Sequence, residues 1–227
     1  MSKQKTSTTS LILAIIALGS ICGFVEVVLG GLLKQAEFAH RSAVLVGLGF
    51  AVIAFSLAIF KKPATAIFIG IITVMSKNLA VVMLHLPVMC MANSSLAVLL
   101  EYGALGGMAA LAMNGMQKNT RNRVLIGGSA AALSSIAFYF IGMRLAPCNH
   151  LLSFNSAVGF FSFLLEESLP WTISALVLFP IGWLIGDKLA NRVLAMLDSR
   201  PSLYYVGSVL TTAVCWTLCA VAISNGL

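Results

Sequence analysis

Long apolar runs separated by short polar breaks make up most of the chain from Leu11 onward. A transmembrane helix needs about 20 apolar residues, because it rises about 1.5 Å per residue through about 30 Å of hydrocarbon. By that measure the pattern predicts seven spans, at about 10–33, 42–60, 64–85, 94–116, 124–146, 168–186 and 203–224. The expected fold is an all-α membrane protein, a bundle of six to seven transmembrane helices forming one domain over 1–227.

The segment 151–167 does not fit this pattern. It is only partly apolar, it follows a break at Pro147, and it ends in two adjacent glutamates. Because it is short for a span, we expect an outer loop or a partly inserted helix here. The sixth span follows it and continues as a polar extension through Asp187 and Lys188.

Composition supports a membrane domain. Hydrophobic residues make up 59% of the chain and charged residues 9%, whereas soluble domains carry about 25% charged residues. The first thirty residues begin with Lys3 and Lys5, as a signal peptide would, but the apolar run Leu11–Leu33 is too long for one, so we predict a retained span. The net charge of +7 does not indicate a nucleic-acid partner, because the basic residues lie in the breaks between spans.

The basic residues predict the orientation of the chain. With the N-terminus in the cytoplasm, ten of the 14 lysines and arginines fall in cytoplasmic segments: Lys3, Lys5, Lys61, Lys62, Lys118, Arg121, Arg123, Lys188, Arg192 and Arg200. Lysine and arginine are enriched in cytoplasmic loops. A cytoplasmic N-terminus therefore agrees with every predicted crossing, provided that 151–167 does not cross.

Ionisable side chains inside the predicted spans gather at one level. Burying such a group at mid-membrane costs about 2.5–3.5 kcal/mol on insertion scales. Glu26, Lys77 and Glu101 all fall in the outer halves of their spans, Arg144 ends the fifth span at the outer face, and Glu166 and Glu167 precede the sixth. Hydration in an outward-facing cavity would reduce the cost of each charge.

We therefore predict an outward-facing polar pocket for a small polar solute. Its predicted binding residues are Glu26, Lys77, Asn78, Asn93, Glu101, Tyr102, Arg144 and Glu166. Because these residues include both acidic and basic side chains, they indicate a polar or zwitterionic solute rather than a simple anion. The alternative is that Lys77 only neutralises Glu26 or Glu101 and that the remaining charges are interfacial anchors.

A metal site is a second hypothesis for the outer face. His85, Cys90, Cys148 and His150 lie in two outer segments and offer imidazole and thiolate ligands, although their spacing matches no known metal motif. The five cysteines form no CxxC pair and are odd in number, which favours neither a zinc ribbon nor a full set of disulfides.

Catalytic motifs are absent from the sequence. The chain has no HExxH helix, no GxSxG elbow and no phosphate-binding glycine loop, so we expect no catalytic residues and no cofactor. Any active transport must then draw its energy from a partner protein or an ion gradient. Two alternatives to transport stay open, a membrane enzyme or redox protein that uses Cys90 and Cys148, and a structural or assembly subunit.

Small residues recur at four-residue spacing in three spans, which lets helix backbones approach closely. The pairs are Ser10 and Ala14, Gly19 and Gly23, Gly103 and Gly107, and Gly182 and Gly186. We expect internal packing at these positions, or, in the first and sixth spans, a docking face for another membrane subunit.

A family resemblance is carried by the third and fourth predicted spans. The residues concerned are Lys61-Lys62-Pro63-Ala64, Gly70-Ile71-Ile72, Lys77-Asn78, Pro87 and Leu99-Leu100-Glu101-Tyr102-Gly103. With the topology of 10–190 this pattern resembles the substrate-binding S components of energy-coupling-factor (ECF) transporters. The seventh span exceeds the six usual there. A nickel- or cobalt-specific member would begin with Met-x-His, and this chain begins with Met1-Ser2-Lys3.

This resemblance implies a membrane transport protein that captures a micronutrient in an outer pocket. It implies a multi-pass protein of a prokaryotic cell membrane, docking by a small-residue stripe on the first helix onto a membrane coupling subunit with two ATPase subunits. The lack of an ATP-binding motif agrees with an assembly in which separate subunits hydrolyse ATP.

Overall fold

The computed structural model describes residues 7–85, 89–156 and 158–227, with the backbone alone for residues 89 and 90. Within these ranges every regular element is helical. Seven helical segments of the described chain are long and apolar enough to cross a membrane. The predicted all-α membrane bundle is therefore confirmed.

The helical elements follow one another along the chain, and four pairs of neighbours join without a break. Their bounds are α1 Thr8–Phe24, η1 Val25–Leu29, α2 Gly30–Gln35, α3 Arg41–Phe60, α4 Ala64–Met83, α5 Met89–Lys118, α6 Thr120–Leu145, α7 Asn149–Leu152, α8 Gly159–Phe163, η2 Leu164–Ser168, α9 Leu169–Ser199 and α10 Pro201–Ser224. The elements η1 and η2 are single π-helical turns. The first spanning segment thus runs over Thr8–Gln35 and the sixth over Gly159–Ser199.

Proline and left-handed backbone set the sharpest helix ends. Lys61 closes α3 in the left-handed conformation with φ 53°, and Pro63 then precedes the first residue of α4. Pro201 is the first residue of α10, where its missing N–H costs nothing. These breaks account for the tight turns that the Lys61-Lys62-Pro63 and Arg200-Pro201 sequences predict.

The segment 151–167 is more helical than expected. After the short helix α7, the chain becomes helical again at Gly159 and continues through η2 into α9, so the sixth span begins there instead of near residue 168. Aromatic packing explains the difference, since the rings of Phe160 and Phe163 each lie 5.1 Å from that of Tyr139 on α6. Only the part around α7 forms an irregular outer connection.

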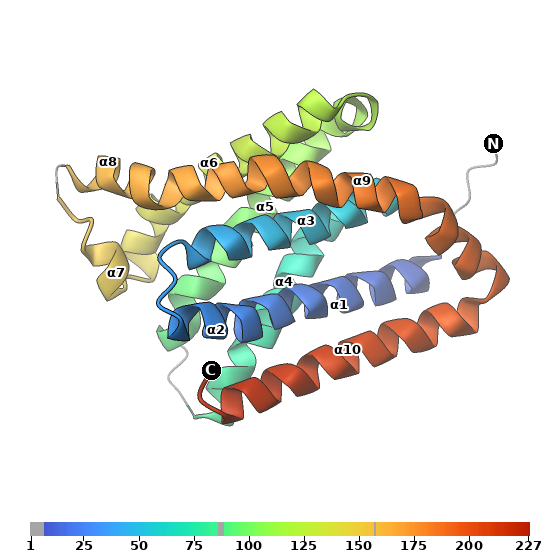
Figure 1. Ribbon diagram of the computed structural model, residues 1–227, viewed down its shortest axis with the longest axis horizontal. Helices are drawn as coiled ribbons and strands as arrows, with labels where there is room; N and C mark the ends of the chain where they lie inside the picture. The colour runs from blue at the N-terminus through green and yellow to red at the C-terminus, as the bar shows by residue number, and fades with distance from the viewer. Residues whose placement is uncertain (1–6, 86–88, 157) are drawn as a thin grey trace.

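Helix α3 lies at the centre of the bundle. In its most apolar window 61% of residues are buried, against 22% for α10. It packs most extensively against α9, while α1 packs against α4 and α10, and α6 against α5 and α9. Figure 1 shows α10 at the edge of the bundle beside α1.

The paired small residues behave differently from one span to the next. A β-carbon at Gly19 would strike Ile72 of α4, and one at Gly182 would fall on the carbonyl oxygen of Ala51 in α3. These glycines therefore form internal helix contacts. Gly103 and Gly107, in contrast, have no atom within 4 Å of such a carbon, so this α5 pair makes no close helix contact within the described chain.

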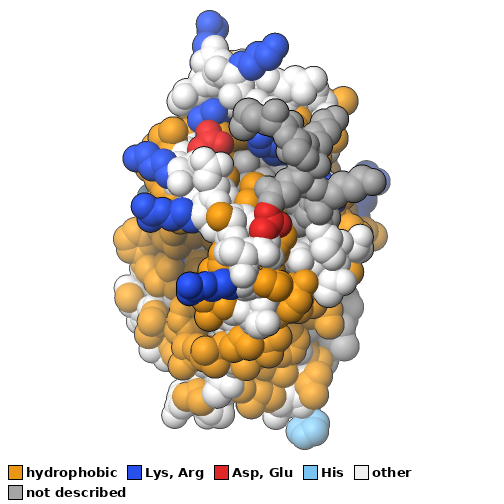
Figure 2. All heavy atoms as spheres, turned by 90° about the vertical axis from the view of Figure 1, so that its right-hand side faces the viewer, with side chains coloured by type: hydrophobic (Ala, Val, Ile, Leu, Met, Phe, Trp, Pro, Cys, Tyr) orange, Lys and Arg blue, Asp and Glu red, His pale blue; other side chains and the backbone are white. Residues whose placement is uncertain are grey.

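Basic residues gather at one end of the bundle. The α3–α4, α5–α6 and α9–α10 connections, which carry Lys61, Lys118 and Arg200, all return at the end where α1 begins. Figure 2 views this end and shows lysine and arginine side chains spread across it above an apolar belt. The connections at the opposite end are those that the charge pattern assigns to the outer side.

Candidate functional site

A cavity of about 460 Å³ opens at the predicted outer end of the bundle. This volume lies in the range of small-molecule sites, which is about 300–1,000 Å³. Its walls come from the first span, the connection to α3, and helices α3, α4, α5, α6, α7, α8 and α9. The lining residues are Glu26, Lys34, Glu37, Phe38, Ala39, Arg41, Ser42, Leu45, Val46, Lys77, Asn93, Ser94, Ala97, Val98, Glu101, Phe138, His150, Phe163, Glu167 and Trp171.

A buried ion pair forms one wall of the cavity. Lys77 Nζ donates to Glu26 Oε2 at 2.7 Å, and the two side chains are 9% and 8% exposed. Glu26 lies on the π-turn η1, a kind of turn that is frequent at functional sites. Of the two partners that the sequence left open for Lys77, the structure selects Glu26.

Glu101 faces the same cavity from α5 without such a partner. The residue is 4% exposed, and its Oε2 is buried with no hydrogen bond to any group in the described chain. The nearby ammonium group, Lys77, is already engaged by Glu26. The cavity wall thus holds two buried carboxylates, Glu26 and Glu101, but one buried ammonium group, Lys77, in a region where each unpaired charge is costly.

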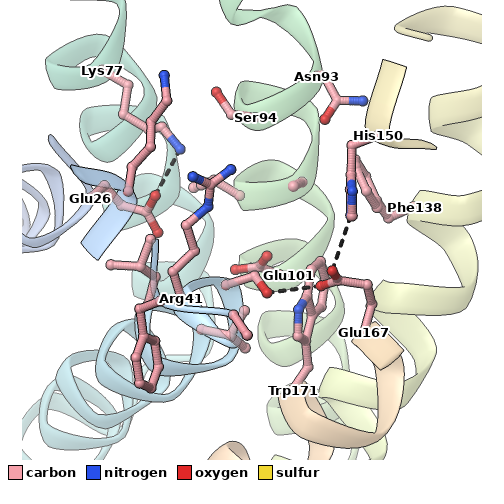
Figure 3. Close-up of a pocket in the computed structure, with 18 of the residues that line it drawn as sticks. Glu26, Arg41, Lys77, Asn93, Ser94, Glu101, Phe138, His150, Glu167 and Trp171 are labelled. Carbon is pink, nitrogen blue, oxygen red and sulfur yellow. Dashed lines mark hydrogen bonds and ion pairs between the residues drawn. The ribbon is translucent and has the colours of Figure 1, made fainter. Parts of the chain in front are cut away.

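A second hydrogen-bonded chain crosses the outer mouth. His150 Nε2 lies 3.0 Å from Glu167 Oε1, and Ser42 donates to Glu167 Oε2 at 2.8 Å. Figure 3 shows His150 above Glu167, linked by a dashed line. The hydrogen bond to the Glu167 carboxylate raises the pKa of His150 above its ordinary value, although burial works in the other direction. Glu167 lies on the second π-turn, η2.

Aromatic side chains line the part of the cavity near Glu101. Phe138, Phe163 and Trp171 are all at least nine-tenths buried, and the rings of Phe138 and Trp171 lie 6.0 Å apart. The indole Nε1 of Trp171 is buried and has no hydrogen-bond partner within the described chain. This wall therefore offers flat apolar surface together with one unused donor.

Four of the eight predicted binding residues line the cavity, namely Glu26, Lys77, Asn93 and Glu101. Asn93 donates its Nδ2 to the carbonyl oxygen of Ala146 at 2.8 Å, which ties the outer part of α5 to the end of α6. Its contribution to the cavity is therefore partly structural.

The other four predicted residues lie outside the cavity lining. Asn78 bonds Val74 O and Ser95 Oγ between α4 and α5, and Tyr102 packs in the core, where its ring lies against Gly49 and Gly70. Their side chains point between helices, an orientation that depth along a helix does not specify.

Arg144 and Glu166 are exposed at the surface. Glu166 is adjacent to Glu167, but successive helical residues point about 100° apart, so only one of the two faces the cavity. The predicted acidic pair is present at the outer end, and Glu167 is the member that contributes to the site.

Three of the four candidate metal ligands, His85, Cys148 and His150, are described, and they form no metal-binding cluster. Among the described residues, no group of three histidine, cysteine or acidic side chains is placed to hold a metal ion. His85 is exposed at the end of α4, and Cys148 Sγ accepts a hydrogen bond from Leu151 N at the start of α7. His150 bonds Glu167, and the side chain of Cys90 lies outside the described residues.

The sequence did not single out Arg41, Ser42 or the aromatic wall as parts of a site. Arg41 is a single basic residue beside a predicted span, and buried aromatics in apolar spans look like ordinary core residues. A signal was present for Arg41, because it starts a span at the same outer level as Glu26 and Glu101. The convergence of these residues depends on how the spans pack.

Comparisons with known protein families, with curated proteins and with solved structures found no match to this chain.

Proposed function

We propose that the protein is a membrane transport protein that captures a small polar solute in its outer cavity. The observation that carries this proposal is Glu101, a carboxylate on a cavity wall that is 4% exposed and has a buried oxygen without a hydrogen-bond partner in the described chain. A fold that only needed stability would replace such a group, because an unsatisfied buried polar atom costs about 1–3 kcal/mol. A bound solute that donates to Glu101 offsets this cost.

The site also has the general form of a small-molecule pocket. Such pockets combine largely apolar walls with a few convergent polar groups. Here Phe138, Phe163 and Trp171 supply the apolar surface, and Glu101 and Arg41 supply polar groups that converge on it.

The proposed assembly is that of an S component in an ECF-type importer of a prokaryotic cell membrane. The chain has no ATP-binding motif, so a coupling subunit and ATPase subunits would provide the energy. A groove of about 270 Å³ at the cytoplasmic half of the bundle supports a docking position, because Ala14 and Ala17 of α1 line it together with Gly207 of α10. Helix α10 flanks this groove, so a coupling subunit would contact α10 as well as α1.

Solute capture is tested by filling the cavity. Ala97 lines it from α5, and Ala110 is exposed on the same helix. The Ala97→Phe variant should lose binding of small molecules that copurify with the wild type, as detected by mass spectrometry after denaturation. The Ala110→Phe variant should retain them, and equal retention by both variants would contradict binding in this cavity.

The assembly is tested by affinity purification from the native host. Gly207 faces the groove, and no atom lies within 4 Å of the place that a β-carbon would occupy there, so Gly207→Trp fills the groove without an internal clash. This variant should lose a coupling subunit and ATPases that the wild type retains. The control Val206→Trp lies at an exposed neighbouring position outside the groove lining and should retain them. A wild-type protein that never retains such subunits would refute the ECF-type assembly.

A further inference from the structure

Four charged groups of the outer cavity have no ion-pair partner in the described chain, the buried Glu101 and the exposed Lys34, Glu37 and Arg41. Glu101 lies on α5 among the aromatic residues, and Arg41 begins α3 at the exposed rim. The ion pairs of the described residues join Lys77 to Glu26, Arg123 to Asp187 and His150 to Glu167, and neither Glu101 nor Arg41 takes part. Among these unpaired groups the buried one, Glu101, is negative, whereas the exposed rim carries two cations, Lys34 and Arg41, and one anion, Glu37.

Glu101 provides the inner end of this arrangement. Its side chain is held on the wall of a spanning helix, where burial excludes water and strengthens any charge interaction. A carboxylate only accepts hydrogen bonds, so its natural partner is an N–H or ammonium group. Lys77 does not supply that partner in the structure, because its Nζ donates to Glu26 Oε2 at 2.7 Å and no hydrogen bond joins it to Glu101 in the described chain.

Arg41 provides the outer end. Figure 3 shows its side chain reaching between Glu26 on one side and Glu101 on the other. A guanidinium presents a planar fork of donors that suits carboxylate and phosphate groups. Its position as the first residue of α3 adds the positive end of a 20-residue helix to the same place.

The cavity also has an aromatic wall, and Figure 3 shows Trp171 and Phe138 on the side of Glu101 away from Arg41. Phe138, Phe163 and Trp171 stand beside Glu101, and the whole cavity measures about 460 Å³. Flat rings of this kind favour apolar or aromatic groups, and their faces also attract cations. A solute that matches the cavity therefore has an apolar body in addition to its two charged ends.

We propose that the solute is a small zwitterion with an apolar body, bound with its cationic nitrogen at Glu101 and its anionic group at Arg41. This inference rests on the proposed solute-capture function and specifies its substrate class. A simple anion would leave Glu101 unmatched, and a simple cation would leave Arg41 without a partner. The wall formed by Phe138, Phe163 and Trp171 would contact the apolar body.

The test uses four classes of probe on the purified full-length protein in detergent. These are the twenty proteinogenic amino acids, the amines that lack their carboxylates, the acids that lack their amino groups, and neutral nucleosides. Equilibrium dialysis with mass spectrometry measures what the protein retains. At least one apolar amino acid should bind, and its amine and its acid should each bind at least about tenfold more weakly, because each loses one charge-assisted contact.

Two variants test the direction of binding. Glu101→Gln should weaken binding of the amino acid and of the amine by at least about tenfold, because each loses its charge-assisted contact, and should leave binding of the acid unchanged. Arg41→Gln should weaken binding of the amino acid and of the acid, and should leave binding of the amine unchanged. The exposed Arg144, which lies outside the cavity lining, supplies the control Arg144→Gln, which should change none of them.

The outcomes separate this inference from the function on which it rests. If an acid, an amine or a nucleoside binds more tightly than every amino acid, the zwitterion assignment is overturned while solute capture stands. If both variants weaken all probe classes equally, the assigned direction is overturned. If the wild-type protein retains no probe of any class, both the zwitterion inference and the solute-capture proposal fail.

Discussion

The two halves of the bundle, which the charge pattern assigns to the outer and the cytoplasmic side, differ in how their charged groups are paired. In the cytoplasmic half, Arg123 is 7% exposed, donates its Nε to the carbonyl oxygen of Met116 at 2.7 Å and lies 5.0 Å from the ring of Trp183. Asp187 lies 3.5 Å from the same guanidinium. In the outer half, Glu101 and Arg41 face a cavity and have no ion-pair partners within the described chain.

The difference separates charged groups that hold helices together from charged groups that are available for binding. The partners of Arg123 are protein groups at the end of α5 and on α9, so its charge is used in holding these helices together. Glu101 and Arg41 have no ion-pair partner in the described chain, so water or a solute is left to stabilise their charges. The following predictions test this contrast, from the largest expected effect to the smallest.

Breaking the buried ion pair of the outer half should have the largest effect. Lys77→Met leaves Glu26 and Glu101 without a cation, and removing one partner of a buried pair costs about 3–5 kcal/mol. The free energy of unfolding, measured in detergent, should therefore fall by about 3–5 kcal/mol. Adding Glu26→Gln to Lys77→Met should recover much of the loss. The exposed Lys62→Met provides the control, and an equal loss there would contradict the role of the pair.

Packing between α3 and α9 should be the next most sensitive feature. Gly182→Ala places a β-carbon on the carbonyl oxygen of Ala51, and overpacking of this kind costs about 1–3 kcal/mol. The larger value is expected because a backbone atom cannot move aside as a side chain can. Gly107→Ala, where nothing lies within 4 Å, should leave the unfolding midpoint unchanged. Equal midpoints for both variants would refute this helix contact.

Removing the cytoplasmic guanidinium should reduce stability without changing solute binding. Arg123→Gln loses contacts to the α5 carbonyl groups and to Asp187, for an expected cost of about 2 kcal/mol in the free energy of unfolding. The exposed Arg121→Gln is the matched control. Solute affinity measured by dialysis should be the same in both variants, and a specific loss of affinity in Arg123→Gln would remove the contrast between the two halves.

The smallest effect should come from His150 and should depend on pH. Glu167 raises the pKa of His150, with a smaller favourable contribution from Glu166, whereas burial and the nearby Arg41 lower it. Because the folded-state pKa is raised, the stabilisation is fully present below the ordinary value of about 6.5 and is lost as pH rises through the folded-state value.

The side chain of His150 is 63% exposed, so solvent screening limits the effect to well under 1 kcal/mol. Melting curves from pH 5 to pH 9 should show this dependence in the wild type and a flatter profile in His150→Gln. A direct titration of His150 by NMR measures the shift itself, and a midpoint below 6.5 would contradict the hydrogen bond to Glu167.

Much of the fold could be predicted from the order of apolar and polar residues. Tight turns at Pro63 and Pro201 begin helices as their sequences indicate, and the two ends of the bundle differ in basic residues as the charge pattern requires. The start of the sixth span could not be predicted, because the helix from Gly159 depends on rings that pack against Tyr139 of α6.

The sequence indicated how far along its helix each site residue lies, but not which way its side chain points. The distances along the spans placed Glu26, Lys77 and Glu101 at one level, and the structure brings all three to one cavity. The same reasoning included Asn78 and Tyr102, which turn toward neighbouring helices. Rotation about a helix axis is about 100° per residue, and a span that is apolar on all sides gives little indication of which face will turn inward.

The sequence by itself determined that this chain is a helical membrane bundle, because apolar segments of about 20 residues match the length of a membrane-spanning helix, which satisfies its backbone hydrogen bonds internally. It also determined the level at which charged groups meet. The tertiary structure alone decided that Lys77 pairs with Glu26, that Glu167 rather than Glu166 faces the cavity, and that Glu101 has no ion-pair partner in the described chain. These outcomes depend on the rotation and contact of packed helices, which bring together residues far apart along the chain.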